Sequence, residues 1–189
     1  MKTEAKSESI VMHVLRLALT LFLIAAVVAG VLAGVNSITA PVIAKLNEEK
    51  TQQAIEMVLP GGYEEQLSDF DNQGGMVSKI YKGANGYALE VLPAGFDNTI
   101  TMMVGVDFEG KVLGISIVKH TETAGLGAVA AAKTSAGEAF RGQFAGLSGS
   151  VGTAKRGTGT LDAITGATIT SEAVCTGVNA ALAVVAAMG

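Results

Sequence analysis

The stretch Thr99-Ile-Thr-Met-Met-Val-Gly-Val-Asp107 decides the fold class, because its apolar residues alternate with a period of two. That period places four side chains on one face of a strand: Ile100, Met102, Val104 and Val106. Shorter apolar runs lie at residues 77–82 and 87–92 before it, and Leu113, Ile115 and Ile117 alternate after it. Several short strands without helices between them predict an antiparallel meander and an α+β fold.

Turn compositions separate these runs. Gly83-Ala-Asn-Gly86, Pro93-Ala-Gly95 and Phe108-Glu-Gly-Lys111 each fall between two predicted strands. Beyond the sheet, an alanine-rich stretch predicts a helix over 128–140, and a loop rich in Gly, Ser and Thr follows at 144–159 with Lys155 and Arg156. A last helix is expected over 171–188, and its apolar stripe would pack on the sheet: Val174, Val178, Leu182 and Val185.

Composition excludes several classes of function. The 189 residues carry 13 Lys+Arg against 17 Asp+Glu, a net charge of −4 that argues against a nucleic-acid partner. The single cysteine, Cys175, rules out an internal disulfide and an iron–sulfur or cysteine-based zinc site built by this chain alone. Two histidines far apart in sequence do not suggest a metal site.

An apolar run near the N-terminus predicts a membrane anchor. Residues 17–35 form an apolar run that is interrupted only by Thr20. This run is long enough for a helix to cross a hydrocarbon core of roughly 30 Å. Lys2, Lys6 and Arg16 precede the run, so the positive-inside rule assigns the N-terminus to the cytoplasm. The alternative is a cleaved signal peptide, but the run exceeds the usual apolar length of such a peptide.

Four segments therefore follow from the sequence: a cytoplasmic tail at 1–16, a transmembrane helix at 17–38, a juxtamembrane helix and linker at 39–75, and a globular domain at 76–189 outside the cytoplasm. Within the third segment a helix is expected at 43–59, because Pro60-Gly-Gly follows it.

Two motifs carry the functional signal. In Asp162-Ala-Ile-Thr-Gly-Ala-Thr-Ile-Thr-Ser171, a small turn opens onto the last helix, which favours an anion at the helix N-terminus. An ordinary helix cap by Thr168, Thr170 or Ser171 explains the same pattern. In His120-Thr-Glu-Thr-Ala-Gly-Leu-Gly127, two glycines would let a flat ligand approach the backbone, although a plain strand-to-helix connection also uses glycine. His120 and Glu122 suggest an acid–base pair, and a surface polar pair is the commoner explanation.

Together the two motifs resemble the FMN-binding domain family whose flavin is linked covalently to threonine. With the N-terminal anchor and the short chain, the resemblance is greatest to the G subunits of Rnf-type ion-translocating ferredoxin:NAD oxidoreductase complexes. It implies that Thr168 carries FMN as a phosphoester and that no catalytic residue is needed on this chain. The resemblance also implies a recognition segment of Asp162, Thr165, Gly166 and Ala167, and a flavin-facing loop of Glu122, Thr123, Gly125, Leu126 and Gly127.

Two residues depart from the family pattern. Ala124 stands where many relatives have proline, and Thr165 replaces the commoner serine while keeping a hydroxyl. Thr170 and Ser171 keep the helix-capping role in this interpretation.

The resemblance implies a membrane-anchored electron-transfer subunit. Its partners would be other membrane subunits of the complex, including a second covalent-flavin subunit and iron–sulfur subunits, and a flavin transferase during maturation. The alternatives are the C subunit of the sodium-translocating NADH:quinone oxidoreductase, a stand-alone membrane-tethered flavin-binding module, and an anchor without a cofactor.

Overall fold

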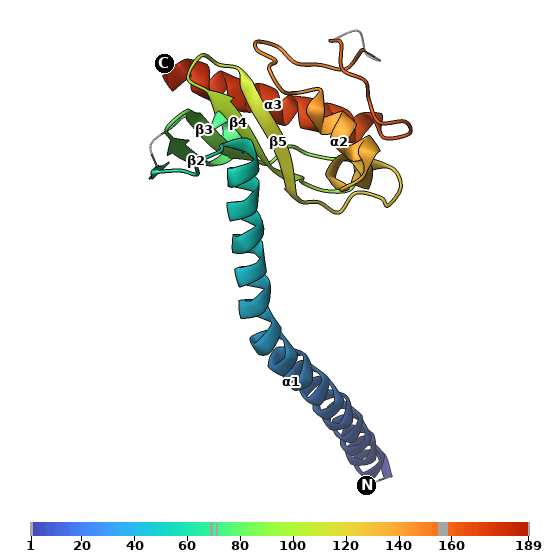
Figure 1. Cartoon of the computed structure of the whole chain (residues 1–189). Helices are drawn as coiled ribbons and strands as arrows, with labels where there is room; N and C mark the ends of the chain where they lie inside the picture. The colour runs from blue at the N-terminus through green and yellow to red at the C-terminus, as the bar shows by residue number, and fades with distance from the viewer. Residues whose placement is uncertain (1, 69, 71, 155–158, 189) are drawn as a thin grey trace. The chain divides into compact units, whose positions relative to one another are not determined.

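A computed structural model describes residues 2–68, 70, 72–154 and 159–188 of the chain. It divides into two compact units, Met1–Asn47 and Glu48–Gly189 (Figure 1). Lys155 and Arg156, expected in an exposed loop, lie outside the described residues.

The N-terminal helix α1 (Lys2–Val58) is continuous, with Pro41 inside it. The anchor and the helix expected at 43–59 are therefore parts of one helix. A proline in a helix interior removes one backbone hydrogen bond, and α1 nevertheless continues on both sides of Pro41. The stretch Met12–Val58 is long and apolar enough to cross a membrane, and its most apolar window is wholly exposed. This supports the predicted membrane anchor.

The second unit contains a five-stranded antiparallel sheet in the order β1-β2-β3-β4-β5. Its strands are β1 (Glu65–Leu67), β2 (Val77–Gly83), β3 (Gly86–Val91), β4 (Thr101–Asp107) and β5 (Val112–Lys119). The predicted meander and the α+β class are confirmed. The short strand β1 was not predicted, because three residues are too few to show alternation. A 3₁₀ turn, η1 (Gln73–Gly75), precedes β2.

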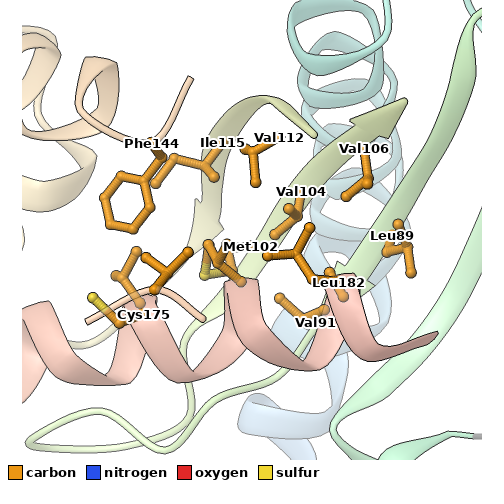
Figure 2. Close-up of a cluster of buried hydrophobic side chains, with 14 of the residues drawn as sticks. Leu89, Val91, Met102, Val104, Val106, Val112, Ile115, Phe144, Cys175 and Leu182 are labelled. Carbon is orange, nitrogen blue, oxygen red and sulfur yellow. The ribbon is translucent and has the colours of Figure 1, made fainter. Parts of the chain in front are cut away.

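Helix α3 (Thr168–Met188) packs on one face of this sheet (Figure 1). Figure 2 shows Met102, Val104 and Val106 of β4 in the same cluster as Cys175 and Leu182 of α3. The predicted stripe on the last helix is buried throughout: Val174, Val178, Leu182 and Val185. Although α3 is also long and apolar enough to span a membrane, 61% of its apolar window is buried in this core. It is a core helix.

The opposite face of the sheet is covered by the C-terminal turns of α1. Buried side chains from this part of the chain pack with Met103, Ala88 and Tyr81 of the strands, namely Ala54, Ile55, Val58 and Leu59. Strand β4 is therefore buried on both faces. Side chains that alternate along β4 enter two different hydrophobic clusters, one on each face of the sheet.

Two predictions about local structure were wrong. The helix expected at 128–140 is broken into a 3₁₀ helix, η2 (Gly127–Ala131), and α2 (Ser135–Gly142). The break occurs because Thr134 is extended and caps α2, its hydroxyl accepting a hydrogen bond from Gly137 N at 3.3 Å. The buried face of β5 also differs from the predicted one at the start of the strand. A register shift opposite Gly105 and Val106 buries Val112 and leaves Leu113 39% exposed.

Candidate functional site

A cavity of about 310 Å³ lies where three separate segments of the second unit meet. The segments are the connection between β3 and β4, the loop after β5, and the N-terminus of α3. The lining residues are Phe96, Glu122, Thr123, Leu126, Gly127, Gly166, Ala167, Thr168, Ile169 and Thr170. The two motifs singled out in the sequence therefore form one pocket.

Thr168 is the first residue of α3 and is half-buried at this pocket. The turn before it depends on Gly166, whose φ of +78° favours glycine. The carbonyl of Ala167 accepts a hydrogen bond from Ser171 N at 3.0 Å, which closes the first turn of the helix. The first N–H groups of a helix have no intrahelical partner, and they carry the positive end of the helix dipole. The Thr168 hydroxyl is thus located at a favourable site for an anion.

Glu122 is 7% exposed and lines the pocket. Its Oε1 accepts hydrogen bonds from Phe96 N at 2.9 Å and Asp97 N at 3.3 Å, and its Oε2 accepts one from the Thr170 hydroxyl. Neither interpretation of His120 and Glu122 holds. The carboxylate is not on the surface, and its hydrogen bonds among the described residues do not include His120.

The capping roles expected for Thr170 and Ser171 are also wrong, because α3 begins three residues earlier than predicted. Both residues lie inside its first turn. Thr170 donates to Glu122, whereas the Ser171 hydroxyl accepts from Ile164 N at 3.0 Å and donates to Ala167 O at 2.9 Å. The Ser171 side chain therefore ties the turn before the helix to the helix itself.

The remaining predicted residues line a neighbouring, more open cavity of about 600 Å³. Gly125, Asp162 and Thr165 belong to it. The backbone of Asp162 is held from both sides by one amide side chain: its N–H donates to Gln143 Oε1 at 2.8 Å, and its carbonyl accepts from Gln143 Nε2 at 3.2 Å. The recognition segment thus starts in one cavity and ends in the other.

Sequence reasoning missed Phe96 and Ile169, which line the first pocket, and it assigned Thr170 to a helix cap although this residue also lines the pocket. Phe96 is 67% exposed and Ile169 48% exposed, so both are large apolar side chains on the surface. An aromatic residue inside the Gly95-Phe96-Asp97-Asn98 turn was the available signal, since such turns are usually polar.

The fold and the pocket define a flavin-binding class of protein. The sequence model of the FMN-binding domain matches residues 95–183, a range that contains every residue of the pocket. A second model, of the N-terminal region of RnfG, matches residues 1–58 and so covers α1.

Full-length relatives identify the family more narrowly. The chain is 32% identical to the G subunit of the Na⁺-translocating ferredoxin:NAD⁺ oxidoreductase complex of Acetobacterium woodii, over 97% of both chains. It is 32% identical to the G subunit of an ion-translocating oxidoreductase complex of Pseudomonas aeruginosa, over 89% of this chain and 86% of the relative. The G subunit of a proton-translocating ferredoxin:NAD⁺ oxidoreductase complex of Clostridium ljungdahlii is 43% identical over 49% of this chain and 50% of its own length. The chain belongs to the RnfG family, the G subunits of ion-translocating oxidoreductase complexes.

The residues of the pocket suit FMN. Its volume lies at the lower end of the range of small-molecule sites, roughly 300–1,000 Å³, and it is partly open to solvent. Phe96, Leu126 and Ile169 supply apolar surface for a flat ring. The N-terminus of α3, which begins at Thr168, supplies an environment for a phosphate.

Proposed function

We propose that this chain is the membrane-anchored electron-transfer subunit of its complex and that it carries FMN covalently on Thr168. The observation that carries the proposal is the position of Thr168, at the start of α3 and in the wall of the pocket. In the part of the chain that the structure describes, its hydroxyl makes no hydrogen bond that would compete with an ester. The FMN-binding domain match supplies the cofactor class.

The other hydroxyls near the motif are poorer candidates. Those of Thr170 and Ser171 are buried and bonded to Glu122, Ile164 N and Ala167 O. Thr165 lines the neighbouring cavity instead. These contacts favour Thr168 as the attachment point and leave Asp162, Thr165, Gly166 and Ala167 to the segment that a flavin transferase reads.

The chain's residues then bind and orient the cofactor. FMN, when bound, supplies one- and two-electron transfer. The unpaired N–H groups and dipole of α3 stabilise the phosphate by roughly 0.3–1 kcal/mol where exposed. Apolar side chains of the pocket exclude water from the ring. Glu122, Thr123, Gly125, Leu126 and Gly127 form or support the facing loop.

The membrane assignment follows from the same family. We propose that residues 17–38 cross the bilayer and that residues 1–16 are cytoplasmic. The domain at 76–189, together with β1 and the last turns of α1 that pack on its sheet, faces the other side. A covalent bond matters there, because free FMN is scarce outside the cytoplasm. Electrons would pass to and from other subunits of the complex, including a second covalent-flavin subunit and iron–sulfur subunits.

Intact mass after co-expression of the full chain with a flavin transferase tests the attachment. We expect an increment of FMN less one water, lost in Thr168→Ala and kept in Thr168→Ser. Thr165→Ala is the matched control. Peptide mapping should find any flavin that this variant carries on residue 168. An increment that survives Thr168→Ala contradicts the site.

Orientation and partners need separate measurements. Thr176 is exposed, so Thr176→Cys in a Cys175→Ala background should react with a membrane-impermeant maleimide from outside the cell. Other components of the complex should co-purify with the tagged chain, and a chain that purifies alone with its flavin would indicate a stand-alone flavin module.

A further inference from the structure

The hydrogen bonds of Glu122 join three segments that are far apart in the sequence. Oε1 holds the β3–β4 connection through Phe96 N and Asp97 N, and Oε2 holds the first turn of α3 through Thr170. Glu122 itself belongs to the loop after β5. Both oxygens are therefore engaged by protein donors, which is the arrangement of a group that positions others.

Two neighbouring glycines leave space for this carboxylate. A Cβ on Gly95 would overlap Glu122 Oε1, and a Cβ on Gly127 would lie 2.5 Å from both Glu122 Oε2 and the Thr170 hydroxyl. Neither glycine has a φ that requires glycine. Their lack of a side chain thus serves the close approach of the carboxylate to its partners.

Phe96 is the residue that this arrangement presents to the pocket. Its backbone N–H is bonded to Glu122, whereas its side chain is 67% exposed and lines the cavity. An aromatic side chain held by its backbone beside a pocket offers a surface on which a flat aromatic ring can pack, in an offset-stacked or edge-to-face arrangement.

The geometry points to Glu122 as a positioning residue that fixes Phe96 as the packing surface for the flavin ring. Glu122 acts through Phe96, and Phe96 contacts the ring. This inference rests on the proposed function, because it assumes that FMN occupies the pocket. It differs from that proposal in concerning the ring and not the phosphoester.

Flavin fluorescence of the full-length, flavin-loaded chain in detergent tests the inference, with iodide quenching as the measure of ring exposure. Phe96→Ala should increase quenching, because the ratio of docked to free ring falls by about two- to tenfold. Glu122→Ala should have a similar effect. The double variant should be no worse than either single variant, since both remove the same contact. Phe108→Ala, another exposed phenylalanine outside the pocket, is the matched control and should leave quenching unchanged.

Glu122→Gln separates positioning from charge. Its amide oxygen can accept from Phe96 N and Asp97 N, and its amino group can donate to the Thr170 hydroxyl, so quenching should stay near that of the parent chain. Quenching as strong as in Glu122→Ala would overturn the inference. So would an unchanged Phe96→Ala, or single effects that sum in the double variant.

The parent chain distinguishes this failure from that of the proposed function. If it shows no mass increment for flavin, covalent attachment is refuted before the variants are compared. If Glu122→Ala does not fold, Phe96→Ala and Glu122→Gln still test the ring contact, because the first changes an exposed side chain and the second is a conservative substitution.

Discussion

Gly105 of β4 lies against the last turn of α1 at Val58. A Cβ built on Gly105 would overlap the Val58 carbonyl oxygen and lie 2.8 Å from its carbonyl carbon. The obstructing atoms are backbone, so rotation of a side chain cannot relieve the overlap. The missing side chain in the middle of a buried strand is therefore what allows α1 to pack on this face of the sheet.

Gly105→Ala should lower the free energy of unfolding by about 1–3 kcal/mol, the usual range for overpacking. Urea unfolding of the detergent-solubilised chain, followed by circular dichroism, measures this. Gly114 pairs with Gly105 across β4 and β5 and has open space at its Cβ position. Gly114→Ala should therefore leave stability unchanged within about 0.5 kcal/mol. Equal losses in both variants would show that the contact with Val58 is not responsible.

The sheet and the pairing of the two motifs could be predicted from the sequence because each depends on local pattern. Alternation in residues 99–107 identified β4, and its core face was assigned correctly at Met102, Val104 and Val106. Its second buried face could not be seen, because Met103 is covered by residues of α1 that are distant in sequence.

The pocket-lining position of Phe96 and its hydrogen bond with Glu122 could not be predicted for the same reason. The position of Phe96 depends on a hydrogen bond from its backbone to a carboxylate 26 residues later. A tertiary contact of this kind leaves no periodicity in the sequence. The break between η2 and α2 was easier to predict, since threonine is a common helix-capping residue and Thr134 precedes α2. The alanines on both sides nevertheless favoured a single continuous helix.

Gly166→Ala should disturb the pocket in two ways, through backbone strain and through a steric contact. The left-handed conformation of Gly166 disfavours alanine by about 1–2 kcal/mol, and the new Cβ would lie 2.9 Å from Leu126 Cδ2. We expect reduced stability together with a displaced Leu126 and greater iodide quenching of the bound flavin.

Gly146→Ala is the control for backbone strain alone. Gly146 has a similar φ of +80° but open space at its Cβ position. It should lose a similar amount of stability in urea and leave flavin quenching unchanged. A change in quenching in both variants would trace the effect to general destabilisation instead of the Leu126 contact.

Burial in α3 should make Cys175 a source of alkaline instability. Burial and the nearby Glu172 raise the pKa of this thiol from 9.0 to about 11. Below pH 9 the thiol is protonated in both the folded and the unfolded chain, so its contribution is fully present. Between pH 9 and about 11 the unfolded chain loses this proton first, which lowers the free energy of unfolding.

Urea unfolding at a series of pH values should show a steeper loss above pH 9 in the parent chain than in Cys175→Ala. The variant is expected to be less stable near pH 8, because it leaves a small gap in the core. Its curve should nevertheless be flatter. Tyr81, whose pKa burial raises to about 12, stays in both chains and contributes equally. Parallel curves would mean that Cys175 is not responsible for the alkaline loss.

Asn179 should hold the segment around Val151 on α3. Its Oδ1 accepts from Val151 N and its Nδ2 donates to Val151 O, both at 2.8 Å, so one side chain satisfies both backbone groups. Asn179→Ala removes both hydrogen bonds at once and leaves the groups of a buried residue without partners. The change should cost about 1–3 kcal/mol, which corresponds to roughly 5- to 150-fold faster amide exchange at Val151.

Hydrogen exchange followed by mass spectrometry distinguishes local release from general loosening. Peptides containing Val151 should exchange faster in Asn179→Ala, while those from β4 should keep most of their protection, because β4 is held by both cores. Thr176→Ala, an exposed substitution on the same helix, should change neither. Equal acceleration in Val151 and β4 peptides would mean that Asn179 stabilises the whole domain, and that the clamp on Val151 is not a separate function of the side chain.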